Sequence, residues 1–191
     1  LVDAGLVKSI GVSNVSIEEL ERLLANCRIR PVVNQVEAHP YFNQHELRAY
    51  LNSQNIRLVA YCPLGNINPG KVRSSLTSRC CTAAEWCACE LTTVVVWLQE
   101  ANVTPLENEH VLAIASRLGK TPAQVVLRWG LQKGHIVIPK SVTESRIVEN
   151  SQIFDFELTD EDVQLLDNLP QRRLVNPRQR PGNQPVFPEH A

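Results

Sequence analysis

The chain has 191 residues, and its 19 Lys and Arg residues nearly balance its 20 Asp and Glu residues, leaving a formal net charge of −1. With 43% hydrophobic residues, the composition is typical of a globular domain. The near-neutral charge argues against nucleic acid as a partner, because proteins that bind polyanions usually carry a clustered basic excess. The longest apolar runs are far shorter than the roughly 20 residues of a membrane-spanning helix, and the first residues lack the basic-then-apolar layout of a signal peptide. We therefore expect no membrane partner and a cytoplasmic location.

Strands and helices alternate along the chain. An apolar, β-branched run over residues 9–13 predicts a strand. Ser16 and Glu19 then form a capping-box pattern, which predicts that a helix begins near Ile17. By the same reasoning we predict strands at 31–37, 56–61 and 136–140 and helices at 43–54, 107–118, 121–132, 143–151 and after 159. Strands separated by helices favour a parallel sheet covered by helices.

Polar side chains gather where the predicted strands end. They are Ser13, Asn14, Gln35, Tyr61, Lys140 and Ser141. Amide, hydroxyl and aromatic groups suit hydrogen bonding and stacking to a planar ligand. Lys140 and Ser141, with Arg146 on the following helix, would form a positive, donor-rich pocket near a helix N-terminus, as an anionic phosphate requires.

Residues 69–102 interrupt this pattern. The segment carries four closely spaced cysteines, Cys80, Cys81, Cys87 and Cys89. Their spacing does not fit a zinc site built from C-x-x-C pairs, so we interpret them as incidental. The stretch 65–71 reads GNINPGK and nearly matches a phosphate-binding loop, but Val72 stands where Ser or Thr would bind Mg²⁺, which argues against an ATPase. We interpret the segment as an atypical insert, such as a retained intron, and so expect few transcripts to carry it.

Residues 171–191 are rich in proline and arginine, a composition with little capacity for regular structure. We expect an extended tail. Two interpretations stay open: a disordered terminus, or a loop packed over a site.

Several motifs, in order along the chain, resemble the aldo-keto reductase family. LVDAGLVKSIGVSN at 1–14 looks like the family's central signature, and IPKSVTESRIVEN at 138–150 looks like its cofactor signature. VVNQVEAHPY at 32–41 and YCPLG at 61–65 resemble two further barrel strands. The resemblance implies an α/β fold that is a partial TIM (β/α)8 barrel, roughly the last four βα units. Residues 1–170 would be the C-terminal half of one barrel, interrupted at about 69–102 and followed by the tail 171–191.

The resemblance also implies a cofactor, NADPH, and a role for each polar residue. Ser13, Asn14 and Gln35 would hydrogen-bond the nicotinamide carboxamide, and Tyr61 would stack on its ring. Lys140, Ser141 and Arg146 would hold the 2′-phosphate. Glu149 and Asn150 would contact the adenine, and the backbone near Leu64 and Gly65 would line the pyrophosphate. The implied reaction is NADPH-dependent reduction of aldehydes or ketones, small-molecule carbonyl substrates, to alcohols.

Two departures from the family pattern affect this expectation. The chain begins at Leu1 and contains no Met, so we interpret it as a fragment. The family's catalytic Asp, Tyr, Lys and His belong to the first half of the barrel, so we expect no catalytic residue here and no turnover by the chain alone. Cys62 also stands where family members often have Ser. An alternative is a truncated, non-catalytic protein that binds a nucleotide or a partner.

The stability of the isolated chain is a further prediction. Four strands of an eight-stranded barrel leave open sheet edges and uncovered apolar faces, so we expect the purified chain to be marginally stable or to aggregate. A scanning calorimetry experiment checks this. A sharp, reversible unfolding transition well above room temperature would contradict it.

Overall fold

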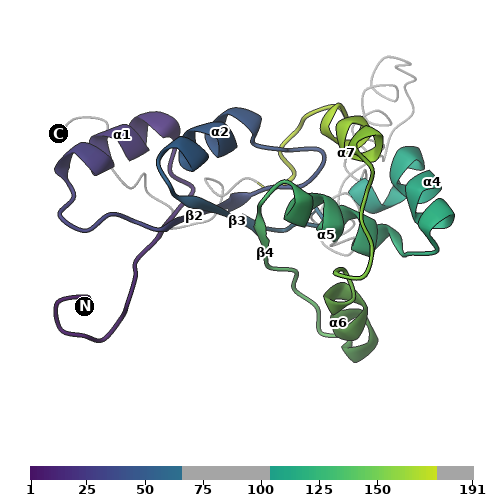
Figure 1. The fold of residues 1–191 in the computed structure, drawn as a ribbon, viewed down its shortest axis with the longest axis horizontal. Helices are drawn as coiled ribbons and strands as arrows, with labels where there is room; N and C mark the ends of the chain where they lie inside the picture. The colour runs from purple at the N-terminus through teal and green to yellow at the C-terminus, as the bar shows by residue number, and fades with distance from the viewer. Residues whose placement is uncertain (66–103, 176–191) are drawn as a thin grey trace, which may run out of the picture.

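The computed structural model describes residues 1–65 and 104–175, and four strands form its central sheet (Figure 1). The strands lie in chain order: β1 (Val12–Ser13), β2 (Val33–Glu37), β3 (Arg57–Tyr61) and β4 (Ile136–Val137). All three neighbouring pairs are parallel, which confirms the predicted parallel sheet. β1 and β4 are shorter than predicted, because each pairs with a single neighbour in the described part of the sheet.

Three features predicted from the sequence lie outside the described residues. They are the insert at 69–102 with its cysteine cluster, all but the first residue of the 65–71 motif, and the tail beyond residue 175. The first part of the tail, 171–175, is described and contains neither helix nor strand, as predicted.

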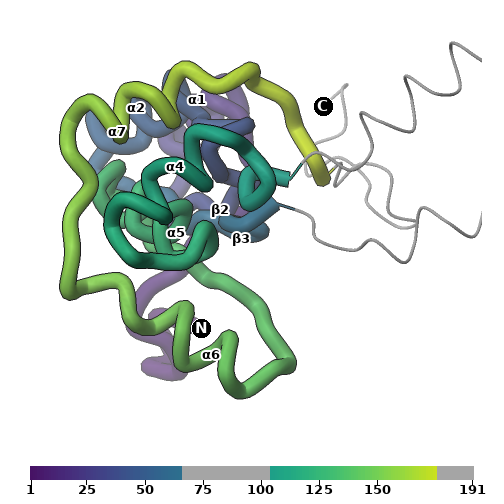
Figure 2. The backbone as a smooth tube through the Cα atoms, turned by 90° about the vertical axis from the view of Figure 1, so that its right-hand side faces the viewer, coloured from purple at the N-terminus to yellow at the C-terminus, as the bar shows by residue number. Residues whose placement is uncertain are grey.

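Helices follow the strands, as predicted. They are α1 (Ile17–Asn26), α2 (His45–Ser53), α4 (Glu109–Leu118), α5 (Pro122–Gln132), α6 (Glu144–Ser151) and α7 (Asp160–Asp167), with a 3₁₀ turn, η1, at Pro105–Glu107. In Figure 1, α1 and α2 lie along the same side of the sheet. Figure 2 shows α6 standing away from the main body of the molecule.

Local capping decides where these helices begin. The predicted capping box is confirmed: Ser16 Oγ accepts from the Glu19 N–H, and α1 begins at Ile17. α2 begins at His45 rather than at residue 43, because Gln44 adopts a left-handed conformation with φ of 53°. α4 begins at Glu109 rather than at 107, because the preceding residues form η1 and Asn108 caps the helix.

The buried core has two parts. One lies between the sheet and the helices α1 and α2, and includes Leu20, Leu51 and Leu58. The other lies among α4, α5 and α7, where Trp129 is 1% exposed and its Nε1–H donates to Asp167 Oδ1 at 2.9 Å. This hydrogen bond satisfies the indole and joins α5 to α7.

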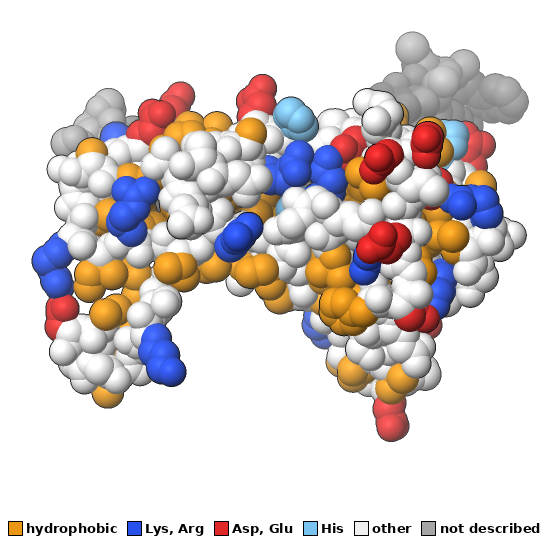
Figure 3. Space-filling view, viewed as in Figure 1, with side chains coloured by type: hydrophobic (Ala, Val, Ile, Leu, Met, Phe, Trp, Pro, Cys, Tyr) orange, Lys and Arg blue, Asp and Glu red, His pale blue; other side chains and the backbone are white. Residues whose placement is uncertain are grey.

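Several apolar side chains stay exposed along the sheet. Val32, Ile136 and Ile138 are 41–46% exposed, and Figure 3 shows apolar side chains gathered along the lower side of the sheet in that view. Within the described residues, the sheet is therefore incompletely covered.

Candidate functional site

One group of predicted residues is joined by hydrogen bonds at the carboxyl ends of β1 and β3. Tyr61, the last residue of β3, donates its hydroxyl proton to Asn14 Oδ1 at 3.0 Å. Asn14 donates from Nδ2 to Ser13 Oγ at 3.1 Å, and Ser13 donates to the Gln35 carbonyl at 2.9 Å. The backbone of Asn14 has φ of 57°, a left-handed conformation that asparagine tolerates better than most residues. The turn after β1 therefore directs the Asn14 amide toward Tyr61.

Gln35 lies in the same group. In the sheet register it pairs with Ser13, so its backbone supports the Ser13 hydroxyl. Its side-chain amide forms no hydrogen bond with the described residues, and the residue is only half-buried. Its side-chain donor and acceptor are therefore available to a ligand.

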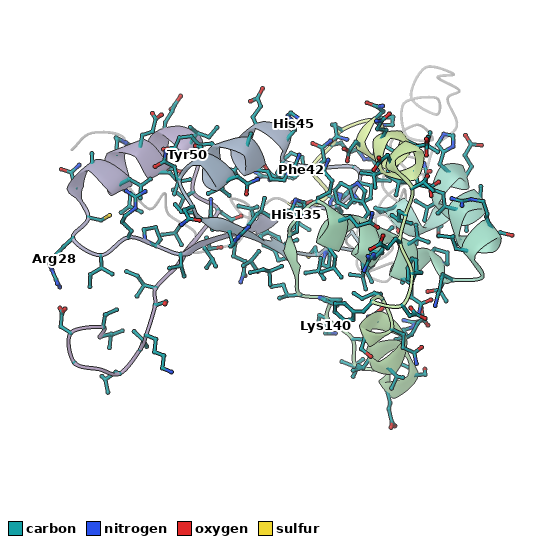
Figure 4. All side chains as sticks on the ribbon, in the orientation of Figure 1. Arg28, Phe42, His45, Tyr50, His135 and Lys140 are labelled. Carbon is teal, nitrogen blue, oxygen red and sulfur yellow. The ribbon has the colours of Figure 1, made fainter. Side chains whose placement is uncertain are left out.

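A second group follows β4. Lys140 is exposed between β4 and α6 (Figure 4), and Arg146 is exposed on α6. Ser141 Oγ accepts from the Thr143 N–H at 3.1 Å, so it shapes the turn that begins the helix. Thr143 is the N-cap residue, but its side chain makes no capping hydrogen bond. The two cations therefore lie near a helix N-terminus whose first N–H groups lack a side-chain cap.

Glu149 and Asn150 lie in different environments at the end of α6. Thr121 Oγ1 donates to Glu149 Oε1 at 2.6 Å, so this carboxylate bonds the N-cap residue of α5. Asn150 is 9% exposed and lines a cavity of about 460 Å³ between β4, α5 and α6, as does Ser141. The structure thus brings Asn150 and Ser141 to one cavity and turns Glu149 toward α5. No hydrogen bond in the described part of the chain joins this second group to the residues around Tyr61.

The loop after β3 contains the last predicted residue, Leu64. Gly65 follows it with φ of 76°, a conformation that glycine adopts readily. A Cβ at this position would lie 2.8 Å from Pro105 Cδ and 3.1 Å from Leu174 Cδ1, so glycine is also required by the close packing. Cys62 has φ of 47° and is half-buried.

Sequence analysis missed two buried polar features. Glu37 and His39 are both fully buried, and His39 Nε2 lies 3.0 Å from Glu37 Oε1. The signal was an acidic residue between Val36 and Ala38, at the end of an apolar strand and two positions before a histidine.

The other missed feature is His135, directly before β4. It is 3% exposed, lines the same cavity as Asn150, and packs edge-to-face on Trp129 at 5.6 Å between ring centroids. Neither ring nitrogen has a hydrogen-bond partner among the described residues. Burial, followed by the charges of Arg48 and Lys133, lowers the pKa of His135 to about 4. The ring is therefore neutral near pH 7.

No helix among the described residues is long and apolar enough to cross a membrane. No group of three or more His, Cys, Asp or Glu side chains in that part of the chain could hold a metal ion.

Comparison with known proteins gives consistent matches. The model of the aldo/keto reductase family matches residues 1–170. Aldo-keto reductase family 1 member A1-A of Danio rerio is 39% identical over 169 residues, which are 88% of this chain and 44% of the relative. Prostaglandin F synthase 2 of Bos taurus is 38% identical over 188 residues, or 97% of this chain and 50% of the relative. The chain thus spans about half the length of these relatives.

Solved structures match over the same half. The aldo-keto reductase AKR2E5 complexed with NADPH superimposes with a TM-score of 0.70 at 38% identity, covering 92% of this chain and 46% of that one. The aldose reductase of Schistosoma japonicum gives a TM-score of 0.69 at 36% identity, with the same coverage. These neighbours are (β/α)8 barrels, so the predicted fold, part of such a barrel, is confirmed.

Proposed function

The chain belongs to the aldo/keto reductase family, and on that premise we propose that it forms the NADPH-binding half of a reductase that converts aldehydes or ketones to alcohols. Residues 1–170 would then be one half of a single barrel interrupted at 69–102, with 171–191 as its tail, in a cytoplasmic enzyme. NADPH, when bound, supplies the hydride that reduces the carbonyl carbon. The residues of this chain hold and orient it.

The group around Tyr61 suits the nicotinamide. A carboxamide offers two N–H donors and one carbonyl acceptor. Asn14 Oδ1 and Ser13 Oγ each keep acceptor capacity after their internal hydrogen bonds, and the Gln35 amide can either donate or accept. The hydrogen bond to Asn14 also fixes the orientation of the Tyr61 ring, whose flat aromatic surface suits stacking on the planar ring of the ligand.

The group around α6 suits the 2′-phosphate. Lys140, Arg146 and the uncapped N–H groups of α6 supply positive charge and donors. Glu144, in the first turn of α6, is negatively charged and would repel a phosphate. The attraction for the phosphate therefore comes from Lys140 and Arg146. Asn150 at the neighbouring cavity supplies an amide for the adenine.

By the same premise, we expect the residues that protonate the carbonyl oxygen to lie outside these 191 residues. The chain alone should therefore bind NADPH without oxidising it in the presence of an aldehyde. If a longer protein that contains the chain behaves in the same way, the alternative of a non-catalytic nucleotide-binding protein is favoured.

The observation that carries the proposal is the hydrogen-bonded series from Tyr61 through Asn14 to Ser13. Tyr61→Ala removes the stacking ring and should weaken NADPH binding by about tenfold, since stacking on an aromatic side chain contributes ~1–3 kcal/mol. Tyr61→Phe, the matched control, keeps the ring and should stay within about threefold of the parent. Quenching of intrinsic fluorescence by NADPH measures both. An unchanged dissociation constant in Tyr61→Ala contradicts the assigned role, and no binding by the parent chain contradicts the proposed function.

A further inference from the structure

Glu37 is a fully buried acid at the carboxyl end of β2. In the sheet register it pairs with Tyr61, so it lies at the same end of the sheet as the proposed nicotinamide residues. A carboxylate without water is strongly disfavoured unless other groups bond it. The groups that bond it therefore indicate what it does.

Most of these groups belong to residues 173–175, far along the chain. Glu37 Oε1 accepts hydrogen bonds from the backbone N–H of Leu174 at 2.7 Å and of Val175 at 2.8 Å. Two successive N–H groups on one oxygen form an anion-binding arrangement, and such charge-assisted bonds are stronger than neutral ones. Arg173 Nε lies 3.7 Å from Oε2, and His39 completes the set at 3.0 Å from Oε1.

Further contacts tie the same segment, 171–175, to the loop after β2. Gln171 donates from Nε2 to the Pro40 carbonyl at 3.0 Å, and its Oε1 accepts from the Asn43 N–H at 2.8 Å. The Arg173 guanidinium lies 5.1 Å from the centre of the Phe42 ring. The segment is thus held at several points, with the Glu37 carboxylate as its buried attachment.

The segment also covers the loop after β3. Leu174 packs with Leu64 against the core cluster of α4, α5 and α7. Its Cδ1 is close enough to Gly65 that an added Cβ there would lie 3.1 Å away. The position of Leu174 therefore restricts the conformations of the Leu64–Gly65 backbone.

We propose that Glu37 is a positioning residue, whose buried carboxylate anchors residues 171–175 across the ends of β2 and β3 and so holds the Leu64–Gly65 loop in place for the cofactor pyrophosphate. The hydrogen bonds that Glu37 accepts from Leu174 and Val175 support its role as an anchor. The effect on cofactor binding rests on the proposed function.

Limited trypsin digestion of the chain tests the anchor, because Arg172 and Arg173 lie inside the anchored segment. Cleavage there requires the segment to detach, and its rate follows the population of the detached form. Glu37→Ala should raise the cleavage rate after Arg173 by at least about tenfold, since two charge-assisted hydrogen bonds are lost. Glu37→Gln keeps an acceptor oxygen and should restore most of the protection. Cleavage after Lys133, at the end of α5, reports global unfolding.

A second variant leaves the buried carboxylate intact. Val175→Pro removes one of the two N–H donors, cannot bond Glu37 Oε1, and keeps the trypsin site after Arg173. It should also speed cleavage after Arg173 without a change after Lys133. Equal cleavage rates in the parent, Glu37→Ala and Val175→Pro would overturn the anchor.

Cofactor binding tests the positioning effect. Val175→Pro and Glu37→Ala should raise the dissociation constants of NADPH and NADH by the same factor, at least about fivefold, because both cofactors contain the pyrophosphate and fewer molecules are binding-competent. If the parent binds NADPH and both variants bind it equally well, the positioning role is overturned. If the parent binds neither cofactor, both the proposed function and the positioning role are contradicted. The trypsin digestion still tests separately whether Glu37 anchors residues 171–175.

Discussion

Arg146→Ala should weaken NADPH binding by roughly ten- to a hundredfold and leave NADH binding within about twofold of the parent. The reason is that only NADPH has the 2′-phosphate, and an exposed guanidinium beside a helix N-terminus contributes through that group alone. Arg146→Lys keeps the charge but loses the bidentate geometry, so it should fall between the parent and the alanine variant. Calorimetric titration with each cofactor gives the two dissociation constants.

Arg57 provides a matched control for this experiment. It is an exposed arginine at the start of β3, at the opposite end of the sheet from the proposed site. Arg57→Ala removes the same charge from the chain and should leave the affinity for both cofactors nearly unchanged. Equal losses for NADPH and NADH in Arg146→Ala, or equal behaviour of the two arginine variants, would contradict the assignment of Arg146 to the 2′-phosphate.

The fold could be predicted from the sequence because its signals are local. Ser16 and Glu19 lie three residues apart, and their capping box fixes the start of α1. Thr121 and Gln124 do the same for α5, and the apolar run before Tyr61 predicts β3. The wrong helix boundaries also have local causes. Because Gln44 is left-handed and a 3₁₀ turn precedes Asn108, α2 and α4 each begin two residues later than predicted, and neither feature leaves a clear periodic signal.

The candidate site could be predicted in part, for a different reason. Parallel strands bring their carboxyl ends together, so Ser13, Asn14 and Tyr61 could be grouped before any contact was known. Their hydrogen bonds join residues up to 47 positions apart, and the structure supplies them. The Glu37 anchor joins Glu37 to Leu174 and Val175, which lie 137 and 138 positions further along the chain. Two of its three hydrogen bonds come from backbone N–H groups, which have no sequence signature. Such contacts depend on the path of the chain after α7, which no local pattern determines.

Lowering the pH from about 7.5 to about 5 should reduce the free energy of unfolding by about 2 kcal/mol through His135 alone. Its pKa of about 4 in the folded state lies below the ordinary value of 6.5, so the unfolded chain binds the proton more readily. The stabilisation is therefore fully present above pH 6.5 and is lost as the pH falls toward 4, where it would total about 3 kcal/mol. Burial is the main cause, Arg48 and Lys133 add to it, and Asp167 opposes them.

His135→Leu removes the ionisable ring from this apolar site and should flatten the pH dependence by that amount. At neutral pH the variant should be as stable as the parent or more stable, because it replaces a ring whose two buried nitrogens have no partner among the described residues. Urea titrations followed by tryptophan fluorescence measure both effects, and the NMR titration of the His135 ring gives its pKa directly. The measurements stop at about pH 5 so that other groups do not add to the effect. The pKa values of Asp155, Glu161 and Asp162 are lowered, so these carboxyl groups change the free energy of unfolding only in more acidic solution.

His45 supplies the comparison that isolates this effect. It is exposed at the start of α2 (Figure 4), so His45→Leu changes the same residue type without uncovering or filling a buried site. Any pH dependence from the other histidines is common to the parent and both variants, and cancels in the differences. A parent whose stability stays flat from about pH 7.5 to 5, or a His135→Leu variant that keeps the parent's slope, would show that the His135 ring is hydrated or paired in solution and not buried as a neutral group.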